Sequence, residues 1–380
     1  MNVLLDGNKA NNTSGYGVKI YGKGYIIDYL TIIDCPEVGF YSEAGVVVGQ
    51  HDWRDMPETH ITLLRVRNCG GDNIVFRGPH DAVFDKIISV NAGGVGFKNE
   101  YLKDVYGGLC HVKYAHVYGS AGDGIELGAS FIGGIIISES NDGRGLYHKT
   151  GTCFIEQLSV YSSATYGIYS ESDKLRIDRA YIYNCSVAAI KLLEKWHKIK
   201  AYIKNNTVSE DLVQIEHNNN ELELHIHDNS LSGNIIRLGT ATTSISNCKI
   251  KAIIVQAEGT VFKLYSAGRN IIEINGWIDT ATANHWDGTK HSTDIVIYKV
   301  AGKGSLNSGI ATFSGDGSTT QFKIEHGLVK APSKVQVTPM SADAAGDFYV
   351  TADDTYIYIN YSTAPPSGTD NVKVSWCAEV

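Results

Sequence analysis

The sequence predicts an all-β protein with a parallel β-helix over residues 1–300 and a small antiparallel β-sandwich over residues 306–380. Three observations support this fold class. The 380 residues include 40 Gly and 22 Tyr but only 7 Pro, a composition typical of short strands joined by tight turns. A small polar turn marker recurs at intervals of about 22 residues, the spacing of one coil in a repeat protein. Between the markers, apolar and polar residues alternate with a period of two, which indicates strands.

The repeated unit is a small polar residue, followed five positions later by Gly, Asn or Ala and at the sixth position by an apolar residue. Such a coil pairs its backbone only with the coils above and below it, so we expect stability to come from stacking. Longer intervals predict insertions near residues 42–58 and 98–108, and the repeat weakens after residue 240. The markers are Asp34, Asn68, Asn91, Gly119, Ser140, Ser162, Asn184 and Asn229, with a weaker copy at Asn205.

The seven cysteines are scattered, and no pair has the spacing of a metal site or a disulfide framework. We therefore expect buried free thiols, no metal and no cofactor. Cys35, Cys69 and Cys185 each follow a marker directly, which predicts a column of small residues at an inward corner of the coils.

The charge balance restricts the possible partners. With 33 basic and 41 acidic residues the formal charge is −8, and no basic run could follow a phosphate backbone, so we expect no nucleic acid. A strongly anionic polymer also fits poorly unless positive charges gather locally. No stretch approaches 18 apolar residues and no signal sequence is evident, so we expect no membrane insertion.

Two segments resemble a known family. The opening LLDGNKANN and GVKIYGKGYIIDYLTIIDC resemble the first coils of pectate-lyase-like right-handed β-helix proteins. The order FKIEHGL, APSKVQVTPM and DFYVTADDTYIYINYSTAPPSG resembles the small β-domain that ends many bacteriophage tail proteins. Together they are similar to bacteriophage tailspike or tail-fibre depolymerases. This resemblance implies a homotrimer in the virion tail that acts outside the host cell and binds, and usually cleaves, a bacterial surface polysaccharide.

Aligning the coils on the markers predicts columns of outward side chains, because equivalent residues of successive coils lie about 4.8 Å apart. Columns one and three residues before the marker are rich in tyrosine, and a third column, seven residues after the marker, adds two more. Tyrosine can contact sugars, but a trimer contact or a plain exposed strand would show the same pattern. The substrate-binding candidates are Arg67, His116, Tyr118, Tyr147, Tyr161, Tyr169, Tyr181 and Tyr183.

Four carboxylates are candidates for catalysis: Glu126, Glu139, Glu156 and Asp178. We expect Glu156 and Asp178 to stack on adjacent coils, where two like charges resist joint ionisation and one acts as a general acid. Paired carboxyls cleave glycosides at separations of about 5–5.5 Å with retention or about 6.5–9.5 Å with inversion. The alternative is that neighbouring arginines neutralise a surface ladder.

The leading hypothesis is a tailspike that hydrolyses a neutral or weakly charged host polysaccharide. One alternative is a lyase acting on uronic-acid polymers, which needs clustered Lys or Arg beside a base. Another is a non-catalytic trimeric receptor-binding fibre. The C-terminal sandwich has two interpretations, a saccharide-binding module or a clamp that holds the trimer.

Overall fold

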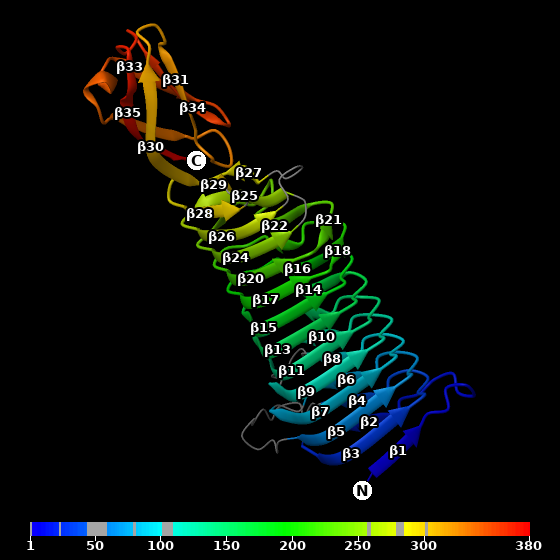
Figure 1. Ribbon diagram of the computed structural model, residues 1–380. Helices are drawn as coiled ribbons and strands as arrows, with labels where there is room; N and C mark the ends of the chain where they lie inside the picture. The colour runs from blue at the N-terminus through cyan, green and yellow to red at the C-terminus, as the bar shows by residue number, and fades with distance from the viewer. Residues whose placement is uncertain are drawn as a thin grey trace.

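The computed structural model describes residues 2–22, 24–43, 59–78, 81–100, 109–256, 260–278, 285–300 and 303–380. Its body is a stack of about 11 coils, and a smaller group of antiparallel strands follows at the C-terminal end (Figure 1). The predicted fold class is therefore confirmed in both parts. The predicted insertions near residues 42–58 and 98–108 lie mostly outside the described residues.

One wall of the coils is a 14-stranded sheet, called here the long-strand sheet. Every coil contributes one strand, and the strands pair in parallel until the antiparallel β28–β29 pair at the C-terminal end. In spatial order the sheet contains β1 (Asn2–Asp6), β3 (Ile26–Ile33), β5 (His60–Arg67), β7 (Ala82–Val90), β9 (Cys110–Tyr118), β11 (Phe131–Glu139), β13 (Cys153–Tyr161), β15 (Leu175–Tyr183), β17 (Lys198–Lys204), β20 (Glu221–His227), β24 (Lys249–Gln256), β26 (Ile271–Ile278), β28 (Ile295–Val300) and β29 (Lys303–Gly304).

A second wall, the short-strand sheet, follows each long strand after a corner. Its strands are β2 (Val18–Tyr21), β4 (Phe40–Glu43), β6 (Ile74–Arg77), β8 (Phe97–Glu100), β10 (Ile125–Gly128), β12 (Leu146–His148), β14 (Tyr166–Ser170), β16 (Ala188–Leu192), β19 (Val213–Ile215), β22 (Asn234–Leu238), β25 (Thr260–Gly268), β23 (Ile245–Ser246) and β27 (Trp286–Thr289). A short parallel pair, β18 (Thr207–Val208) and β21 (Ser230–Leu231), widens two coils at the corner.

The C-terminal strands form two antiparallel three-stranded sheets whose inner faces share one apolar core. This core is separate from the core of the coils. The first sheet contains β30 (Leu306–Gly315), β35 (Gly368–Glu379) and β32 (Lys334–Pro339), and the second contains β31 (Gln321–Glu325), β34 (Tyr356–Tyr361) and β33 (Phe348–Ala352). A 3-10 turn at Ala342–Ala344 follows β32.

The marker residue of each coil forms the corner after the long strand. Asp34, Asn68, Ser140, Ser162 and Asn184 all have φ between 54° and 60°. This left-handed conformation is costly for most side chains but accessible to Asn, Asp and Gly, which explains the marker's composition. The repeat is thus a backbone requirement at a turn.

One marker was misplaced by a single residue. At the corner after β20, the residue with the positive φ is Asp228, at 47°. Asn229 occupies the next position and is buried. There the Asn229 Oδ1 accepts the backbone N–H of Asn206 at 3.0 Å, and the Asn206 Oδ1 accepts that of Cys185 at 2.8 Å. Asparagine is favoured at both positions, so the sequence alone cannot separate them.

The inward column after the marker contains the small residues that the sequence predicts. Cys35, Cys69 and Cys185 are buried free thiols in this column, whereas the buried Cys248 follows Asn247 at the other corner of its coil, directly before β24 and in register with Asn220. The expectation of buried thiols is wrong for Cys377, which is exposed on β35. Among the described residues, no three His, Cys, Asp or Glu side chains are placed to hold a metal ion.

The interior of the coils is mostly apolar, with buried asparagines such as Asn206 and two buried histidines. Phe76, Phe84 and Phe97 stack edge to face, with ring centroids 5.2 and 6.4 Å apart. Two coils contain histidine instead, and burial lowers the pKa of His148 and lowers that of His197 to about 3. Both imidazoles are therefore neutral at pH 7. No helix in the described ranges has the length and apolarity needed to cross a bilayer.

The corner bonds can be tested by replacing Asn206. We expect Asn206→Ala to lower the free energy of unfolding by about 2–3 kcal/mol, because buried backbone groups of neighbouring coils lose their partner. Asn205→Gly is the matched control and should cost less than about 1 kcal/mol, because glycine readily adopts the left-handed corner. Urea unfolding followed by circular dichroism measures both, and equal losses would contradict the assigned roles.

Candidate functional site

The outward face of the long-strand sheet carries columns of side chains in continuous register. The predicted column one residue before the marker is paired strand by strand through β5, β7, β9, β11, β13, β15, β17 and β20. It contains Arg67, Val90, Tyr118, Glu139, Tyr161, Tyr183, Lys204 and His227. The parallel column two residues earlier contains His116, Tyr181, Tyr202 and His225.

Tyrosine rings in these columns contact one another. Tyr161 and Tyr183 are stacked, with centroids 5.3 Å apart and planes 11° from parallel. Their ring faces are therefore directed at each other, and they present edges and hydroxyls to solvent. Tyr202 is tilted by 51° from Tyr183 and by 54° from Tyr181, and its ring centroid lies 5.3 Å from that of His227, with the planes 31° apart. Burial raises the pKa of Tyr183, which keeps its hydroxyl as a hydrogen-bond donor at neutral pH.

A shallow depression of about 280 Å³ lies on this face over β15, β17 and β20. Its cause is a bulge: Asp178 and Arg179 of β15 lie opposite the single residue Lys200 of β17. At this register strands β7 to β13 also have two consecutive outward residues, whereas β17 and β20 have one. Fewer outward side chains therefore cover the sheet from β17 onward, and the surface is lower there. The depression is lined by Asp178, Arg179, Ala180, Tyr181, Lys200, Ala201, Tyr202, Glu223 and His225.

Glu156 and Asp178 lie on adjacent strands at the same register. The pairs Ile155–Ile177 and Gln157–Arg179 place Glu156 opposite Asp178, so their backbones are about 4.8 Å apart. Asp178 accepts a hydrogen bond from the Arg176 Nε at 2.9 Å. Glu156 is exposed and makes no ion pair with the described residues. The two carboxyls therefore have different environments.

Glu139 is in a different part of the same face. It lies between Tyr118 and Tyr161 in the aromatic column, and its Oε2 is 3.2 Å from the Nε2 of His116. Five residues along the strand separate its register from that of Glu156 and Asp178, a distance of about 16 Å. Glu139 cannot form a carboxylate pair with either of them.

The remaining candidates, Glu126, Tyr147 and Tyr169, lie on the short-strand sheet. Glu126 is buried at 6% exposure and lies within 3.3 Å of the Lys149 Nζ and 3.8 Å of the Lys98 Nζ. The Tyr147 hydroxyl donates to Glu171, and burial together with this bond raises the pKa of Tyr147 to about 12. These three residues cannot share a site with the long-strand columns because they face away from them.

Arg144 lies over the ring of Tyr147 and forms an ion pair with Asp123. Its guanidinium bonds both oxygens of Asp123 and lies 3.4 Å from the centre of the Tyr147 ring. Asp123 also accepts the backbone N–H of Arg144 at 2.7 Å. The turn aspartate thus holds the corner of its coil.

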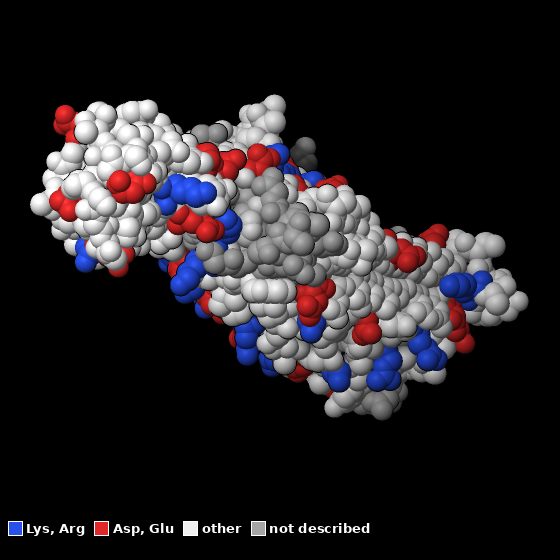
Figure 2. Space-filling view, turned by 45° about the horizontal axis from the view of Figure 1, so that its top comes forward, with Lys and Arg blue, Asp and Glu red and all other residues white. Residues whose placement is uncertain are grey.

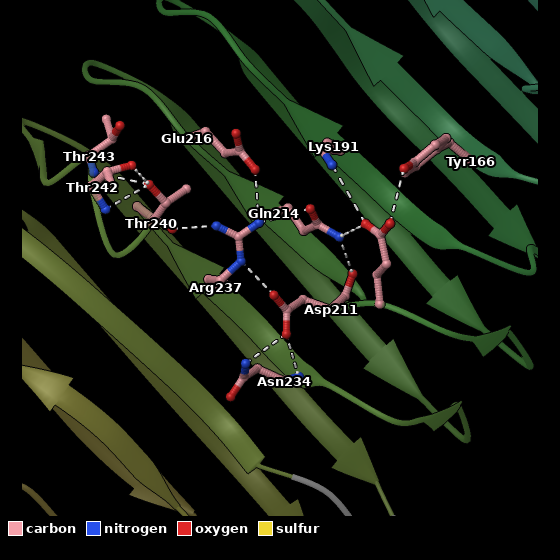
Figure 3. Close-up of polar contacts among 12 residues, drawn as sticks. Tyr166, Lys191, Asp211, Gln214, Glu216, Asn234, Arg237, Thr240, Thr242 and Thr243 are labelled. Carbon is pink, nitrogen blue, oxygen red and sulfur yellow. Dashed lines mark hydrogen bonds and ion pairs between the residues drawn. The ribbon is translucent and has the colours of Figure 1, made fainter.

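Further along this sheet the same pattern continues. Figure 3 shows Arg237 between Asp211 and Glu216, with Gln214 as a third partner. The Lys191 Nζ lies 3.6 Å from Glu210. Of the described residues, each Lys or Arg of β6, β8, β16 and β22 has a carboxylate partner. The charges of these cations are therefore neutralised within the protein.

Three solved structures match the chain in fold comparison, and all three are phage tailspikes. The tailspike gp61 of Pseudomonas phage phi297 has 9% identity and a TM-score of 0.43, over 94% of this chain and 67% of that one. The tailspike gp49 of Pseudomonas phage LKA1 has 10% identity and a TM-score of 0.29, over 99% and 68%. The Gp54 tailspike of Acinetobacter baumannii phage AP22, in complex with a capsular saccharide, has 10% identity and a TM-score of 0.29, over 93% and 66%.

No protein-family model and no curated protein sequence matches the chain.

Sequence analysis missed four residues of the depression: Lys200, Tyr202, Glu223 and His225. Tyr202 stands in the same column as Tyr181, and that signal was available in the alignment. The bulge at β15 shifts the register by one residue, so the positions before Lys200 no longer align. Glu223 is held ionised, because the hydrogen bond from Lys200 keeps its pKa below the usual value.

Proposed function

We propose that this chain is a phage tailspike whose long-strand face binds and hydrolyses a bacterial surface polysaccharide. The observation that carries the proposal is the register-aligned set of tyrosines and histidines over β9–β20, beside a depression that contains Asp178. A series of hydroxyls and ring edges spaced about 4.8 Å apart suits a long, regularly repeating hydroxylated ligand. Together with the resemblance of the sequence to tailspikes, this supports a location in the virion tail.

The carboxyl pair supplies a mechanism for hydrolysis. Glu156 would donate its proton to the oxygen of the glycosidic bond as that bond breaks, while the Asp178 carboxylate, hydrogen-bonded to Arg176, attacks the anomeric carbon. Water then cleaves the glycosyl–Asp178 bond, and Glu156 takes the proton from that water. The strand spacing of about 4.8 Å corresponds to the short carboxyl separation of retaining enzymes.

The lyase alternative is favoured by one specific observation. Arg179 lies in the depression beside Tyr181 and Tyr202, and it makes no ion pair with any described residue. It could neutralise the carboxylate of a uronic acid while a tyrosine removes the adjacent proton. A lyase product carries an unsaturated bond that absorbs ultraviolet light, and a hydrolase product does not.

Replacement of the carboxyl pair tests the hydrolytic mechanism. We expect Glu156→Gln and Asp178→Asn each to reduce the release of reducing ends at least a hundredfold, because general acid–base and nucleophilic steps contribute factors of about 10²–10⁴. The assay uses the polysaccharide that the unmodified protein degrades best. Glu221→Gln is the control, since Glu221 lies on the same face but pairs with Lys198 and Lys249.

Full activity in either variant would remove the pair from the mechanism. Absorbance of an unsaturated product would replace hydrolysis by the lyase alternative. Binding without new reducing ends after long incubation would indicate a non-catalytic fibre.

We propose that the chain assembles as a homotrimer through an apolar patch at the C-terminal end of the long-strand sheet. Ile271, Trp277, Ile295 and Ile297 on β26 and β28 are 47–56% exposed. Leu306 of β30, 62% exposed, adjoins them and extends the patch toward the C-terminal sheets. Ile271 and Ile295 are paired across β26 and β28, Ile297 lies two residues further along β28, and Trp277 lies beyond Asn275 on β26. Exposed apolar side chains of this kind mark association sites, and further copies of the same chain are partners that are always present.

The double variant Trp277→Lys/Ile297→Lys tests the assembly. We expect it to elute at the 41.4 kDa mass of one chain, while the unmodified protein has three times that mass, because charges in the contact oppose burial. Light scattering after size exclusion measures the mass. Tyr349→Lys, an exposed aromatic of the C-terminal sheets, is the control. A variant that keeps the mass of the unmodified protein would place the contact elsewhere.

A further inference from the structure

The long-strand face has a charge opposite to that of the whole protein. Over strands β5 to β24 its outward positions carry eleven Lys or Arg and six Asp or Glu, and none of these side chains is buried. The face therefore has five excess positive charges, although the complete chain has a formal charge of −8. Figure 2 shows Lys and Arg recurring along one long edge of the elongated body.

Most acids of this face are neutralised within the face itself. Asp85 is 2.6 Å from the Lys113 Nζ, and this bond holds the pKa of Asp85 below its usual value. Asp178, Glu221 and Glu223 have basic partners at 2.9–3.1 Å. The acids thus leave little negative potential to repel an anion.

Several cations of the same face have no such partner. Arg65, Arg67, Arg179 and Lys251 make no ion pair with any residue that the structure describes. On the short-strand face Arg77, Lys98, Lys191 and Arg237 are paired with carboxylates, and Lys19 of β2 lies over tyrosine rings. Guanidinium groups without a carboxylate partner are suited to bind carboxylate or phosphate groups of a ligand.

The unpaired cations are distributed along the coils rather than clustered. From Arg65 on β5 to Lys251 on β24 there are eight strand steps, about 38 Å at 4.8 Å per step. A small anion cannot reach both ends, whereas a polymer with a charge in each repeating unit can.

The ring geometry favours a polysaccharide over single-stranded nucleic acid. Binding of unpaired bases uses open ring faces, but Tyr161 and Tyr183 direct their faces at each other. The edges and hydroxyls that they present instead suit the hydroxyl groups of sugars.

We infer that the ligand of this face is an anionic polysaccharide, with a carboxylate or phosphate in its repeating unit. The inference rests on the proposed function and narrows its substrate class. Composition alone argued against an anionic polymer unless positive charges gather locally, and the coil stacking gathers them on one wall. The bound polymer would run along the coils, with its sugars against the tyrosine columns and its charges at Arg67, Arg179 and Lys251.

The test measures binding of the full chain to purified capsular polysaccharides of known structure, in three groups that carry no charge, a carboxylate or a phosphate. We expect the tightest binding in a charged group, and comparison of the two charged groups identifies which anion is recognised. Removing the charge of the best ligand, by carboxyl reduction or by cleavage of its phosphate groups, should weaken binding at least tenfold. Raising the salt concentration from 50 to 500 mM should weaken it similarly, because the contacts are screened.

Two matched triple variants distinguish the effect of the charges on this face from the effect of the protein's net charge. Arg67→Gln/Arg179→Gln/Lys251→Gln should bind at least tenfold more weakly. Lys323→Gln/Lys334→Gln/Lys373→Gln removes the same three charges from the C-terminal sheets and should change the affinity less than twofold.

The outcomes distinguish the two claims. Tightest binding to an uncharged polymer, or equal affinity after charge removal, would overturn the anionic ligand while leaving the proposed function intact. Binding to no polysaccharide would overturn both. Displacement of the polysaccharide by a 30-nucleotide single strand of thymidylate at equal affinity would assign the face to nucleic acid instead.

Discussion

Parallel hydrogen bonding between successive coils is the constraint on which the rest of this structure depends. Because the register repeats from β3 to β15, every outward side chain lies beside its counterpart in the next coil. The left-handed corner after each long strand from β3 to β20 keeps this register, since these coils turn at an equivalent residue. Where the register changes by one residue, between β15 and β17, fewer side chains cover the outward face of the sheet and the depression forms. Local backbone geometry therefore sets the position of the candidate site.

Much of this architecture could be predicted from the sequence, because the corner restricts residue type. Positive φ selects Asn, Asp, Ser and Gly, so the coils can be aligned and the columns of Tyr161, Tyr183 and Glu139 placed correctly. Two features could not be predicted. The bulge at Asp178 cannot be recognised in the sequence, because the outward residues on either side of it are polar whether or not a residue is inserted. Whether a cation is paired, as Arg237 is and Arg179 is not, depends on partners from other coils.

The two walls of the coils differ in how their charges are used. On the short-strand sheet, Arg144, Lys98 and Arg237 are bound by carboxylates, and ion pairs of this kind fix side chains in place. On the long-strand sheet, Asp85, Asp178, Glu221 and Glu223 pair with bases, whereas Arg65, Arg67, Arg179 and Lys251 have no carboxylate partner among the described residues. One wall thus stabilises the stack, while the other keeps functional groups available at fixed spacing. The same stack of coils serves both purposes, because the side chains of a column determine whether its charges are paired within the protein or available to a ligand.

The most direct measurement of the central claim is a structure of the Glu156→Gln protein with an oligosaccharide of its best polymer bound. The account predicts sugar density along the long-strand sheet over β13–β20, in contact with Tyr202 and Arg179 and with a glycosidic oxygen near residue 156. Density on the short-strand sheet, against Arg144 and Tyr147, would contradict it.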